Sequence, residues 1–405
     1  MVHESEDGPR PECTGRGKIR RYYSGVSTWW TTISCSVLIV SLPFSRGGDV
    51  FAEDSKLRLL PATAAWTMVL NSSLTATPAL AGQRAYFPLE ADRLAAYDLM
   101  LGSLLWVVKA SPRSQPVVGD GLVFFVEEAV LTALREDDGT PAWQVPFSET
   151  LAAPLAWEDG WLLAATSGGT IIALRAADGM TLWQRGLGVP AHASPSLSGD
   201  RAYVPLSDGR VVALRLEDGG LTWQRRLGGA PNAVLALDDR LYVGSDDNRF
   251  YCLRTLDGEL VWRWITGADV VGMPLVDEQR VYFASLDNVL RSLDRNSGAQ
   301  RWKRGLMLRP AFRLVKVGDI LLVAGTSSTL SAFNMRDGTP AGQIPVGGEL
   351  AAAPHVLSST ALPRVAVVAR DIAKGAIVTL FIRLIDPPEA ALGTLPNVIP
   401  QPKAP

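Results

Sequence analysis

A ten-residue pattern that returns every 37 to 40 residues is the feature of this chain that most limits its fold. LRAADGMTLW at 174–183 is followed by LRLEDGGLTW at 214–223 and LRTLDGELVW at 253–262. The pattern ends in tryptophan at seven positions: Trp66, Trp106, Trp143, Trp183, Trp223, Trp262 and Trp302. A period of this size is typical of architectures in which each repeat is one supersecondary unit stacked on the next.

Other positions of the pattern are as regular as the tryptophan. A further step of the period reaches Gly342, so an eighth unit is marked without an indole. A glycine lies four residues before seven of these marks, at Gly102, Gly139, Gly179, Gly219, Gly258, Gly298 and Gly338. A small residue lies six residues before each glycine, at Ala96, Ala133, Ala173, Ala213, Cys252, Ser292 and Ala332, and a large apolar residue follows it each time.

Turn signals divide each repeat into four short apolar runs. In the repeat that contains Trp223, the breaks are at 198–200, 207–209 and 218–220. Each break contains Gly next to Asp, a hairpin signal because glycine adopts positive φ without a Cβ clash. A proline twelve residues after the tryptophan, at Pro78, Pro195, Pro274 and Pro354, is predicted to open the first strand, where its missing N–H disrupts no ladder.

Four short antiparallel strands per repeat predict the blade of a β-propeller. A single blade cannot bury both of its faces, so neighbouring blades must cover each other. We therefore interpret the small residue as the point where sheets approach closely and the large residue as inter-blade core. The indole of the outermost strand is expected to cover a blade junction, a structural role and not that of a ligand platform.

The two ends of the repeat region predict how the ring closes. Trp66 ends a blade whose other strands are missing upstream, whereas AAAPHVL, PRVAVVARD and GAIVTLFIRLI, within 350–386, have no tryptophan strand after them. Pairing them gives an all-β, eight-bladed propeller over 62–386, with four-stranded antiparallel blades and one blade shared by the N- and C-terminal strands. Such closure removes open sheet edges. We expect a monomer.

The N-terminal residues 1–52 have the layout of a signal peptide or an uncleaved signal anchor. A basic cluster ending at Arg21 precedes the uncharged segment 22–44, and Val50 and Ala52 suit a cleavage site. That segment is also long enough to span a bilayer. A lipid anchor at Cys35 and a twin-arginine signal at Arg20-Arg21 are weaker alternatives. Export to the periplasm or cell envelope follows, with a linker at 53–61 and a disordered, proline-rich tail at 387–405.

Composition argues against several functions. A net charge of −2 gives no general attraction to nucleic acid. Cys252 is the only cysteine of the repeats, so they hold no disulfide, and His192 and His355 are expected in separate blades, without a zinc cluster. The acidic pairs Asp246-Asp247 and Glu127-Glu128 fall in turns, where we expect solvated charge and no calcium cage. No catalytic, cofactor-binding or metal-binding residue is predicted.

The pattern small, large, Asp-Gly, Trp resembles the pyrroloquinoline-quinone-type propeller repeat, over residues 62–386. Among such proteins, the size, the export signal and the eight blades are similar to those of the BamB family. That resemblance implies a non-catalytic scaffold in outer-membrane β-barrel assembly, which binds the periplasmic domains of BamA. BamB proteins are usually lipid-anchored, whereas the sequence around Cys35 is a poor match to a lipoprotein signal.

Two other functions remain open at this point. Quinoprotein alcohol dehydrogenases share the repeat and stack their quinone between a tryptophan and a disulfide of adjacent cysteines, but no Cys-Cys pair exists here. A propeller that binds a small molecule or polysaccharide in its channel or on one face is the second alternative. For a protein partner, the segments RWITGADVVGMP (263–274) and RWKRGLMLRPAFR (301–313) are the candidate surface, because Arg and aromatic residues are enriched in binding hot spots.

Overall fold

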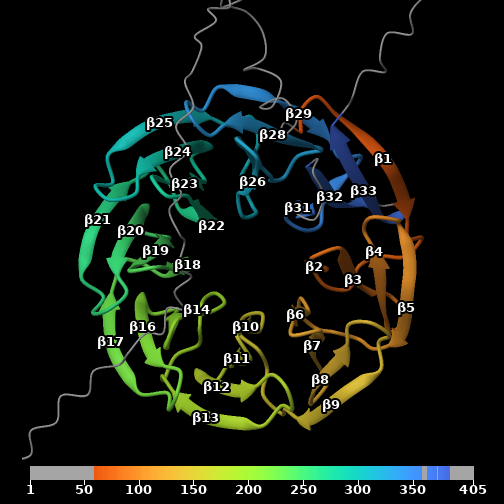
Figure 1. Cartoon of the computed structure of the whole chain (residues 1–405). Helices are drawn as coiled ribbons and strands as arrows, with labels where there is room; N and C mark the ends of the chain where they lie inside the picture. Colours follow the sequence, from red (N-terminus) through yellow and green to blue (C-terminus); the bar gives the residue numbers. More distant parts are fainter. Residues whose placement is uncertain (1–58, 358–362, 372, 384–405) are drawn as a thin grey trace, which may run out of the picture. The chain divides into compact units, whose positions relative to one another are not determined.

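Eight antiparallel sheets surround one axis in the described chain, as Figure 1 shows along that axis. The computed structural model describes residues 59–357, 363–371 and 373–383. All of its named elements are strands, which confirms the predicted all-β, eight-bladed propeller. No helix able to cross a membrane occurs among these residues. The predicted signal segment 1–52 and the predicted tail 387–405 lie outside them.

Seven blades are continuous in sequence, each with its strands in chain order from the axis outward. Blades 1 to 4 comprise β2 (Ala79–Ala81), β3 (Arg84–Leu89), β4 (Arg93–Asp98), β5 (Ser103–Lys109); β6 (Val117–Gly119), β7 (Leu122–Glu127), β8 (Val130–Arg135), β9 (Pro141–Pro146); β10 (Ala156–Glu158), β11 (Trp161–Ala165), β12 (Thr170–Arg175), β13 (Thr181–Gly186); and β14 (Ser196–Ser198), β15 (Arg201–Pro205), β16 (Arg210–Arg215), β17 (Leu221–Arg226). Blades 5 to 7 comprise β18 (Pro231–Leu237), β19 (Arg240–Ser245), β20 (Arg249–Arg254), β21 (Leu260–Ile265); β22 (Val270–Val276), β23 (Arg280–Ser285), β24 (Val289–Asp294), β25 (Gln300–Gly305); and β26 (Val315–Val317), β27 (Ile320–Val323), β28 (Thr329–Asn334), β29 (Pro340–Pro345).

The closing blade joins the two ends of the propeller, as the sequence predicts. It contains β1 (Ala62–Val69), β30 (Glu349–Leu350), β31 (His355–Leu357), β32 (Arg364–Asp371) and β33 (Gly375–Arg383). β1 pairs antiparallel with β33 from Ala62 opposite Arg383 to Val69 opposite Ile377. The short β30 is a fifth strand that was not predicted. It pairs with the end of β32, where four other blades have a single isolated bridge.

The turn chemistry explains most strand boundaries. The glycine of each turn between the third and fourth strands has φ between 68° and 73°, a region that glycine adopts without strain. Pro78, Pro195 and Pro354 each directly precede a first strand. Pro274 differs, because it lies inside β22, where the pairing with β23 shifts register between Val271 and Leu275. Because of this register shift, Pro274 has no paired residue on β23, and its missing N–H breaks no hydrogen bond between the two strands.

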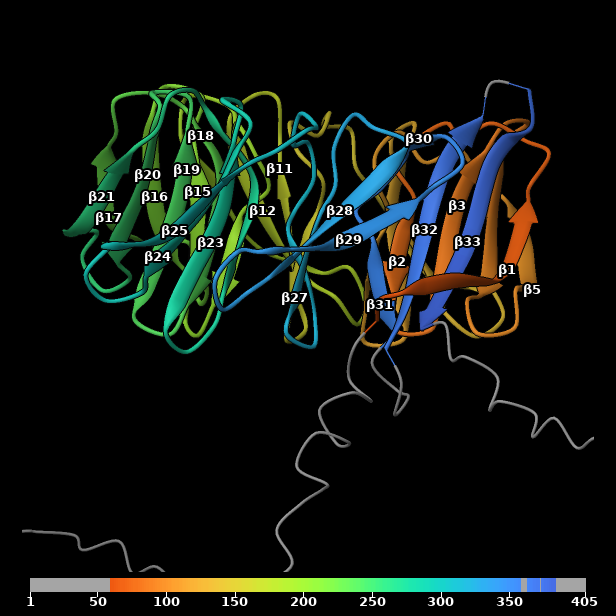
Figure 2. The ribbon, with the colours of Figure 1, turned by 90° about the horizontal axis from the view of Figure 1, so that it is seen from above.

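The strands run between two faces of the ring (Figure 2). The terminal face carries the turns after the first and third strands of each blade, together with Ala62 and Arg383. The connection face carries the turns between the second and third strands and the connections from one blade to the next. The core lies between blades: each of eight hydrophobic clusters combines residues of two consecutive blades.

Candidate functional site

The seven repeated tryptophans each reach into the following blade. Every indole Nε1 donates a hydrogen bond of 2.5 to 3.3 Å to a backbone carbonyl there, on Met100, Glu136, Ala176, Leu216, Thr255, Arg295 and Met335 in turn. The indole also covers the repeated glycine of that blade's turn. A Cβ on those glycines would lie 2.6 to 3.3 Å from the ring, so the turn and the indole are in direct contact.

The small residue of the repeat lies opposite the same indole within each blade. The pairs are Ala96–Trp106, Ala133–Trp143, Ala173–Trp183, Ala213–Trp223, Cys252–Trp262 and Ser292–Trp302. All six small residues are fully buried. With one edge hydrogen-bonded and one face on a glycine, the tryptophans of blades 1 to 6 make the contacts between neighbouring blades.

The eighth junction, between blade 7 and the closing blade, is built differently. Gly342 pairs with Ala332 where the other blades have a tryptophan, and its φ is 142°. No Asp-Gly turn joins β33 to β1, so an indole at Gly342 would have no glycine to cover. Leu60 takes that place, 3.2 Å from a Cβ on Gly342, and its neighbour Leu59 is completely buried in the junction cluster. Both leucines lie in the segment interpreted as a linker.

A second inter-blade contact was not predicted from the sequence. Arg201, the first residue of β15, donates from Nη1 to the carbonyls of Thr255 and Leu256, 2.9 and 2.6 Å away in the next blade. Arg280 of β23 makes the same contact with Met335 and Arg336. These arginines therefore hold the same turn that the indole covers. The available signal was arginine at the start of the second strand, at Arg84, Arg201, Arg240, Arg280 and Arg364.

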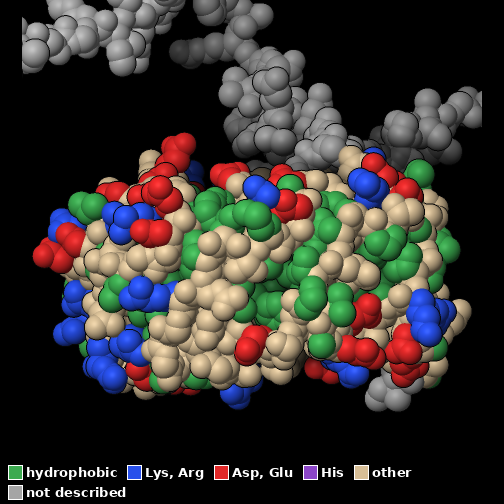
Figure 3. Space-filling model, turned by 90° about the horizontal axis from the view of Figure 1, so that it is seen from below, with side chains coloured by type: hydrophobic (Ala, Val, Ile, Leu, Met, Phe, Trp, Pro, Cys, Tyr) green, Lys and Arg blue, Asp and Glu red, His purple; other side chains and the backbone are tan. Residues whose placement is uncertain are grey.

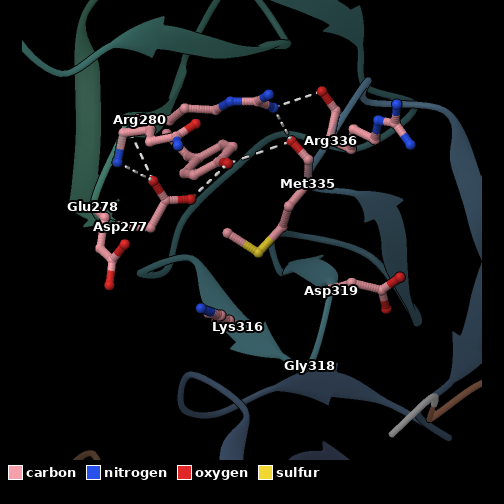
Figure 4. Close-up of a pocket in the computed structure, with 10 residues that line it drawn as sticks. Asp277, Glu278, Arg280, Lys316, Gly318, Asp319, Met335 and Arg336 are labelled. Carbon is pink, nitrogen blue, oxygen red and sulfur yellow. Dashed lines mark hydrogen bonds between the residues drawn. The ribbon is translucent and has the colours of Figure 1, made fainter. Parts of the chain in front are cut away.

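A pocket of about 410 Å³ opens on the terminal face between blades 6 and 7 (Figure 4). Tyr282 donates to Asp277 over 2.9 Å, and burial followed by this hydrogen bond raises the pKa of the phenol. Asp277 also accepts the backbone N–H groups of Gln279 and Arg280. These groups are thus committed to the fold, and the pocket holds no paired nucleophile and base.

Four charged side chains of this pocket have no hydrogen-bond or ion-pair partner among the described residues: Glu278, Lys316, Asp319 and Arg336. Figure 4 shows the carboxylates of Glu278 and Asp319 on opposite sides of the pocket. Two cations and two anions so arranged favour neither an anionic nor a cationic ligand. The pocket can accept a polar group, but its charges do not define a ligand class.

The innermost strands of blades 1 and 2 line a mainly apolar cleft. The cleft has a volume of about 260 Å³ and is lined by blades 1 to 4, mainly by Ala, Leu, Val and Pro. Its polar side chains tie blades together: Gln115 Nε2 donates to the Pro78 carbonyl and Ser194 Oγ to that of Pro154, each over 3.1 Å. His192 contacts Asn232 over 3.2 Å in the next blade.

The other propeller histidine, His355, lies in a different blade. Its Nε2 is 2.9 Å from the Gly82 carbonyl, and burial lowers the pKa of the imidazole. Within the described residues, no group of three His, Cys, Asp or Glu side chains is placed to hold a metal ion. The two histidines thus contact neighbouring blades and do not form a joint site.

One of the acidic pairs departs from the expectation of solvated charge. Asp246 is exposed, but only 7% of the Asp247 side chain is accessible. Burial alone would raise the pKa of Asp247, yet hydrogen bonds from Tyr251, Ser245 and Arg249 hold it below its usual value. Arg249 and Tyr251 are two residues apart on one strand, so their side chains lie on the same face of that strand. Both can therefore reach Asp247 in the preceding turn. Glu127 accepts the N–H of Ser111, and Glu128 is exposed.

The two segments predicted as a partner surface come together on the connection face. Both contact the β23–β24 turn of blade 6: Leu286 N–H donates to Asp269, and Leu306 N–H donates to the carbonyl of Asn288. Large apolar side chains on these segments are exposed, with 67% of Ile265, 38% of Met273 and 96% of Met307 accessible. Arg309 and Arg313, on the second segment, are also exposed. We call these five residues the connection surface.

Asp287, in the β23–β24 turn, holds the backbone of the first segment in place through hydrogen bonds. It accepts hydrogen bonds from Gly267 N–H at 3.0 Å and from Arg291 at 2.6 Å. Burial alone would raise the pKa of Asp287, but bonds from Arg291, Ser285 and Gly267 lower it to about 2. Its contribution to stability is therefore complete above the unfolded pKa near 4 and is lost as the pH falls to about 2.

Replacing Asp287 by asparagine is expected to lower the free energy of unfolding by about 2 kcal/mol at pH 7. Urea unfolding at pH 7 and at pH 2 measures this. The difference between wild type and D287N should be much smaller at the lower pH, because about half of the folded wild-type molecules then have a protonated carboxyl. A difference that is independent of pH would contradict the assigned role.

Comparisons with known proteins agree with this architecture. A family model described as outer membrane protein assembly factor BamB matches residues 93–236 and 233–372. The crystal structure of BamB from Moraxella catarrhalis is 20% identical, covering 66% of this chain and 96% of that one, with a TM-score of 0.53. No curated protein matches the sequence.

Other solved structures share the fold at lower identity. The computationally designed protein Ika8 is 14% identical over 78% of this chain and 97% of its own, with a TM-score of 0.65. The quinohemoprotein alcohol dehydrogenase from Comamonas testosteroni is 13% identical over 82% of this chain and 78% of its own, with a TM-score of 0.64. At these identities, the likeness shows the fold alone.

Proposed function

The chain belongs to the family of the outer membrane protein assembly factor BamB, and on this premise we propose that it is a non-catalytic propeller scaffold of the cell envelope. Its partners are proteins, among them a BamA-like component that assembles outer-membrane β-barrels. The N-terminal segment directs the chain to the periplasm, as a cleaved signal or as a membrane anchor. The family match over both halves of the propeller is the observation that carries this proposal.

The connection surface supports a protein partner. Exposed apolar side chains next to arginine have the composition of an interface centre, where aromatic residues, Met and Arg are enriched. Met307 is almost fully accessible in the absence of a partner. Unbranched methionine side chains adapt to a partner's shape, which suits a docking surface. Burying Met307 would gain about 2 kcal/mol of the binding free energy.

The residues do not fit the quinone of the related dehydrogenases. That cofactor needs adjacent cysteines beneath it, and the three cysteines of the sequence, at 13, 35 and 252, are far apart. Cys252 is buried, and burial raises the pKa of its thiol to about 12. The indoles of blades 1 to 6 already lie on the glycine turns. We therefore propose no reaction step and no cofactor for this chain.

The scaffold role is tested by crosslinking the tagged full chain in its own envelope and identifying what is recovered. We expect a component of the β-barrel assembly machinery, and we expect Met307→Asp to abolish its recovery. Leu256→Asp is the matched control, because Leu256 is 64% exposed on the terminal face. The control should recover the partner as wild type does. Failure to recover any such component, with normal barrel levels in a strain that lacks the protein, would rule out this role.

A further inference from the structure

The connection face carries a hollow between blades 2 and 3, outside the connection surface, which lies on blades 5 to 7. The hollow has a volume of about 240 Å³. It is lined by Val126 and Glu128 of blade 2, by residues 149–151, which lead into blade 3, and by Arg113 and Ser114, which lead into blade 2. Figure 3 shows acidic and basic side chains close together at its lower right edge, on the connection face.

Three charged side chains line this hollow without a partner. Arg113, Glu128 and Glu149 are exposed, and the side chain of none of them forms a hydrogen bond or an ion pair among the described residues. One guanidinium and two carboxylates around the same small space are thus not paired with each other. Both signs of charge remain available to a ligand.

The hollow also contains a hydroxyl group without a partner and an apolar wall. Ser114 Oγ has less than 1 Å² of accessible surface and no hydrogen-bond partner among the described residues. A hydroxyl withdrawn from water costs free energy unless another group pairs with it, so few buried hydroxyls stay in this state. A polar ligand atom at Ser114 offsets that cost. Val126 is buried and Leu151 half-buried, and together they form the apolar wall.

The backbone at Glu128 has a conformation that suits other residue types better. Its φ is 50°, in the left-handed region that residues other than Gly, Asn and Asp rarely adopt. In blades 3 to 6, the residue with positive φ in the corresponding turn is Gly169, Gly209, Asn248 or Asn288. Glutamate is therefore less stable here than asparagine, but it adds a carboxylate to the hollow.

We propose that this hollow binds a small zwitterion, an α-amino acid with an apolar side chain. Arg113 holds the carboxylate of the ligand, since arginine pairs with carboxylates through two parallel hydrogen bonds. Glu128 and Glu149 accept hydrogen bonds from the ligand's ammonium group, and Ser114 pairs with a third polar atom. The ligand side chain lies against the apolar wall. The inference is independent of the scaffold role proposed above.

The charges and the size of the hollow favour this class over others. A simple cation would be repelled by Arg113 and leave it unpaired, and a simple anion would be repelled by both carboxylates. An α-amino acid pairs with all three charges at once. Pockets for drug-sized ligands have volumes of about 300 to 1,000 Å³. A hollow of about 240 Å³ therefore suits a smaller molecule.

The test is binding of L-leucine to the purified full chain, measured by titration with saturation-transfer difference NMR, which detects weak ligands. We expect saturable binding with a Kd of about 1 mM or below, a reasonable value for so small a ligand. N-acetyl-L-leucine lacks the ammonium group, and L-leucinamide lacks the carboxylate. Each should bind about tenfold more weakly or worse, because each loses hydrogen bonds to a charged group.

Variants connect this binding with the hollow. Arg113→Gln and Glu149→Gln should each weaken L-leucine binding about tenfold. Asp246→Asn is the matched control, because it removes an exposed carboxylate from the same face at blade 5, and it should bind as wild type does. Glu128→Asn should also weaken binding about tenfold and yet unfold at an equal or higher urea concentration, because asparagine adopts positive φ more readily. Such a loss of binding cannot result from misfolding.

Three outcomes would overturn the proposal. The first is no saturable binding of L-leucine to wild type at about 10 mM, ten times the expected Kd. The second is equal affinity for L-leucinamide, which would show that only the ammonium group is recognised and would assign the hollow to the N-terminus of a peptide. The third is unchanged binding in Glu128→Asn and Glu149→Gln, which would place the ligand elsewhere. None of these outcomes affects the scaffold role, which is tested by crosslinked partners.

Discussion

Trp223→Ala is expected to cost about 3 to 5 kcal/mol of the free energy of unfolding, the range for removing a large buried aromatic side chain. Trp223 is 8% exposed and donates to the Thr255 carbonyl over 2.9 Å. Its ring also covers Gly258 of the next blade. Alanine removes this contact and leaves a cavity between blades 4 and 5. Urea unfolding followed by circular dichroism measures the loss.

Two controls make this prediction specific. Trp264→Ala, on β21, removes a half-buried indole outside the repeat and should cost only about 1 kcal/mol. Gly258→Ala should cost about 3 kcal/mol in wild type, because a Cβ would lie 2.6 Å from Trp223 and φ is 72°. In the Trp223→Ala background only the backbone cost of about 1 kcal/mol remains. Additive effects of the two substitutions would contradict direct contact.

The second large effect is expected at the junction that closes the ring. Leu59→Ala should lower the free energy of unfolding by about 2 to 5 kcal/mol, because Leu59 is completely buried between blade 7 and the closing blade. The loss should be local as well as global. Amide hydrogen exchange in β1 should accelerate more than exchange in β16, which lies far from the junction.

The control for this variant is Leu256→Ala, at a leucine that is 64% exposed, which should change stability by less than about 0.5 kcal/mol. If Leu59→Ala behaves like this control, the leucine is not part of the junction. Equal acceleration of exchange in β1 and β16 would show that the substitution destabilises the ring uniformly. In that case Leu59 would have no special role in closure.

The repeat made the blades predictable from the sequence. Indole, glycine and small residue recur because each blade meets the next in the same way, and repeated geometry leaves a repeated pattern. The number of blades and the shared terminal blade followed from the same spacing and are confirmed by the pairing of β1 with β33.

Features that occur once in the ring were not predictable in this way. Leu59 and Leu60 replace the indole only at the closing junction, so no other repeat reveals their role. The burial of Asp247 depends on the side chains of Arg249 and Tyr251, which point towards it. Two adjacent aspartates in a sequence do not indicate such contacts.

The same limit applies to the candidate site. The connection surface was predicted from composition, but its exposure and its support by Asp287 required the fold. The arginines at the start of the second strands are a repeated signal in the sequence, yet their targets are backbone carbonyls of another blade. A backbone carbonyl can accept a hydrogen bond whatever side chain its residue carries, so these contacts do not constrain the type of the partner residue.

The central claim, that the two ends of the propeller share one blade, is tested most directly by a disulfide between β1 and β33. Thr67 and Thr379 are directly paired, with their hydroxyl oxygens 3.2 Å apart. In a chain with Cys13 and Cys35 changed to serine, we expect Thr67→Cys and Thr379→Cys to crosslink almost completely on mild oxidation, and the bond to raise stability by about 2 to 4 kcal/mol. Two thiols that remain free and reactive under these conditions would contradict the closed ring.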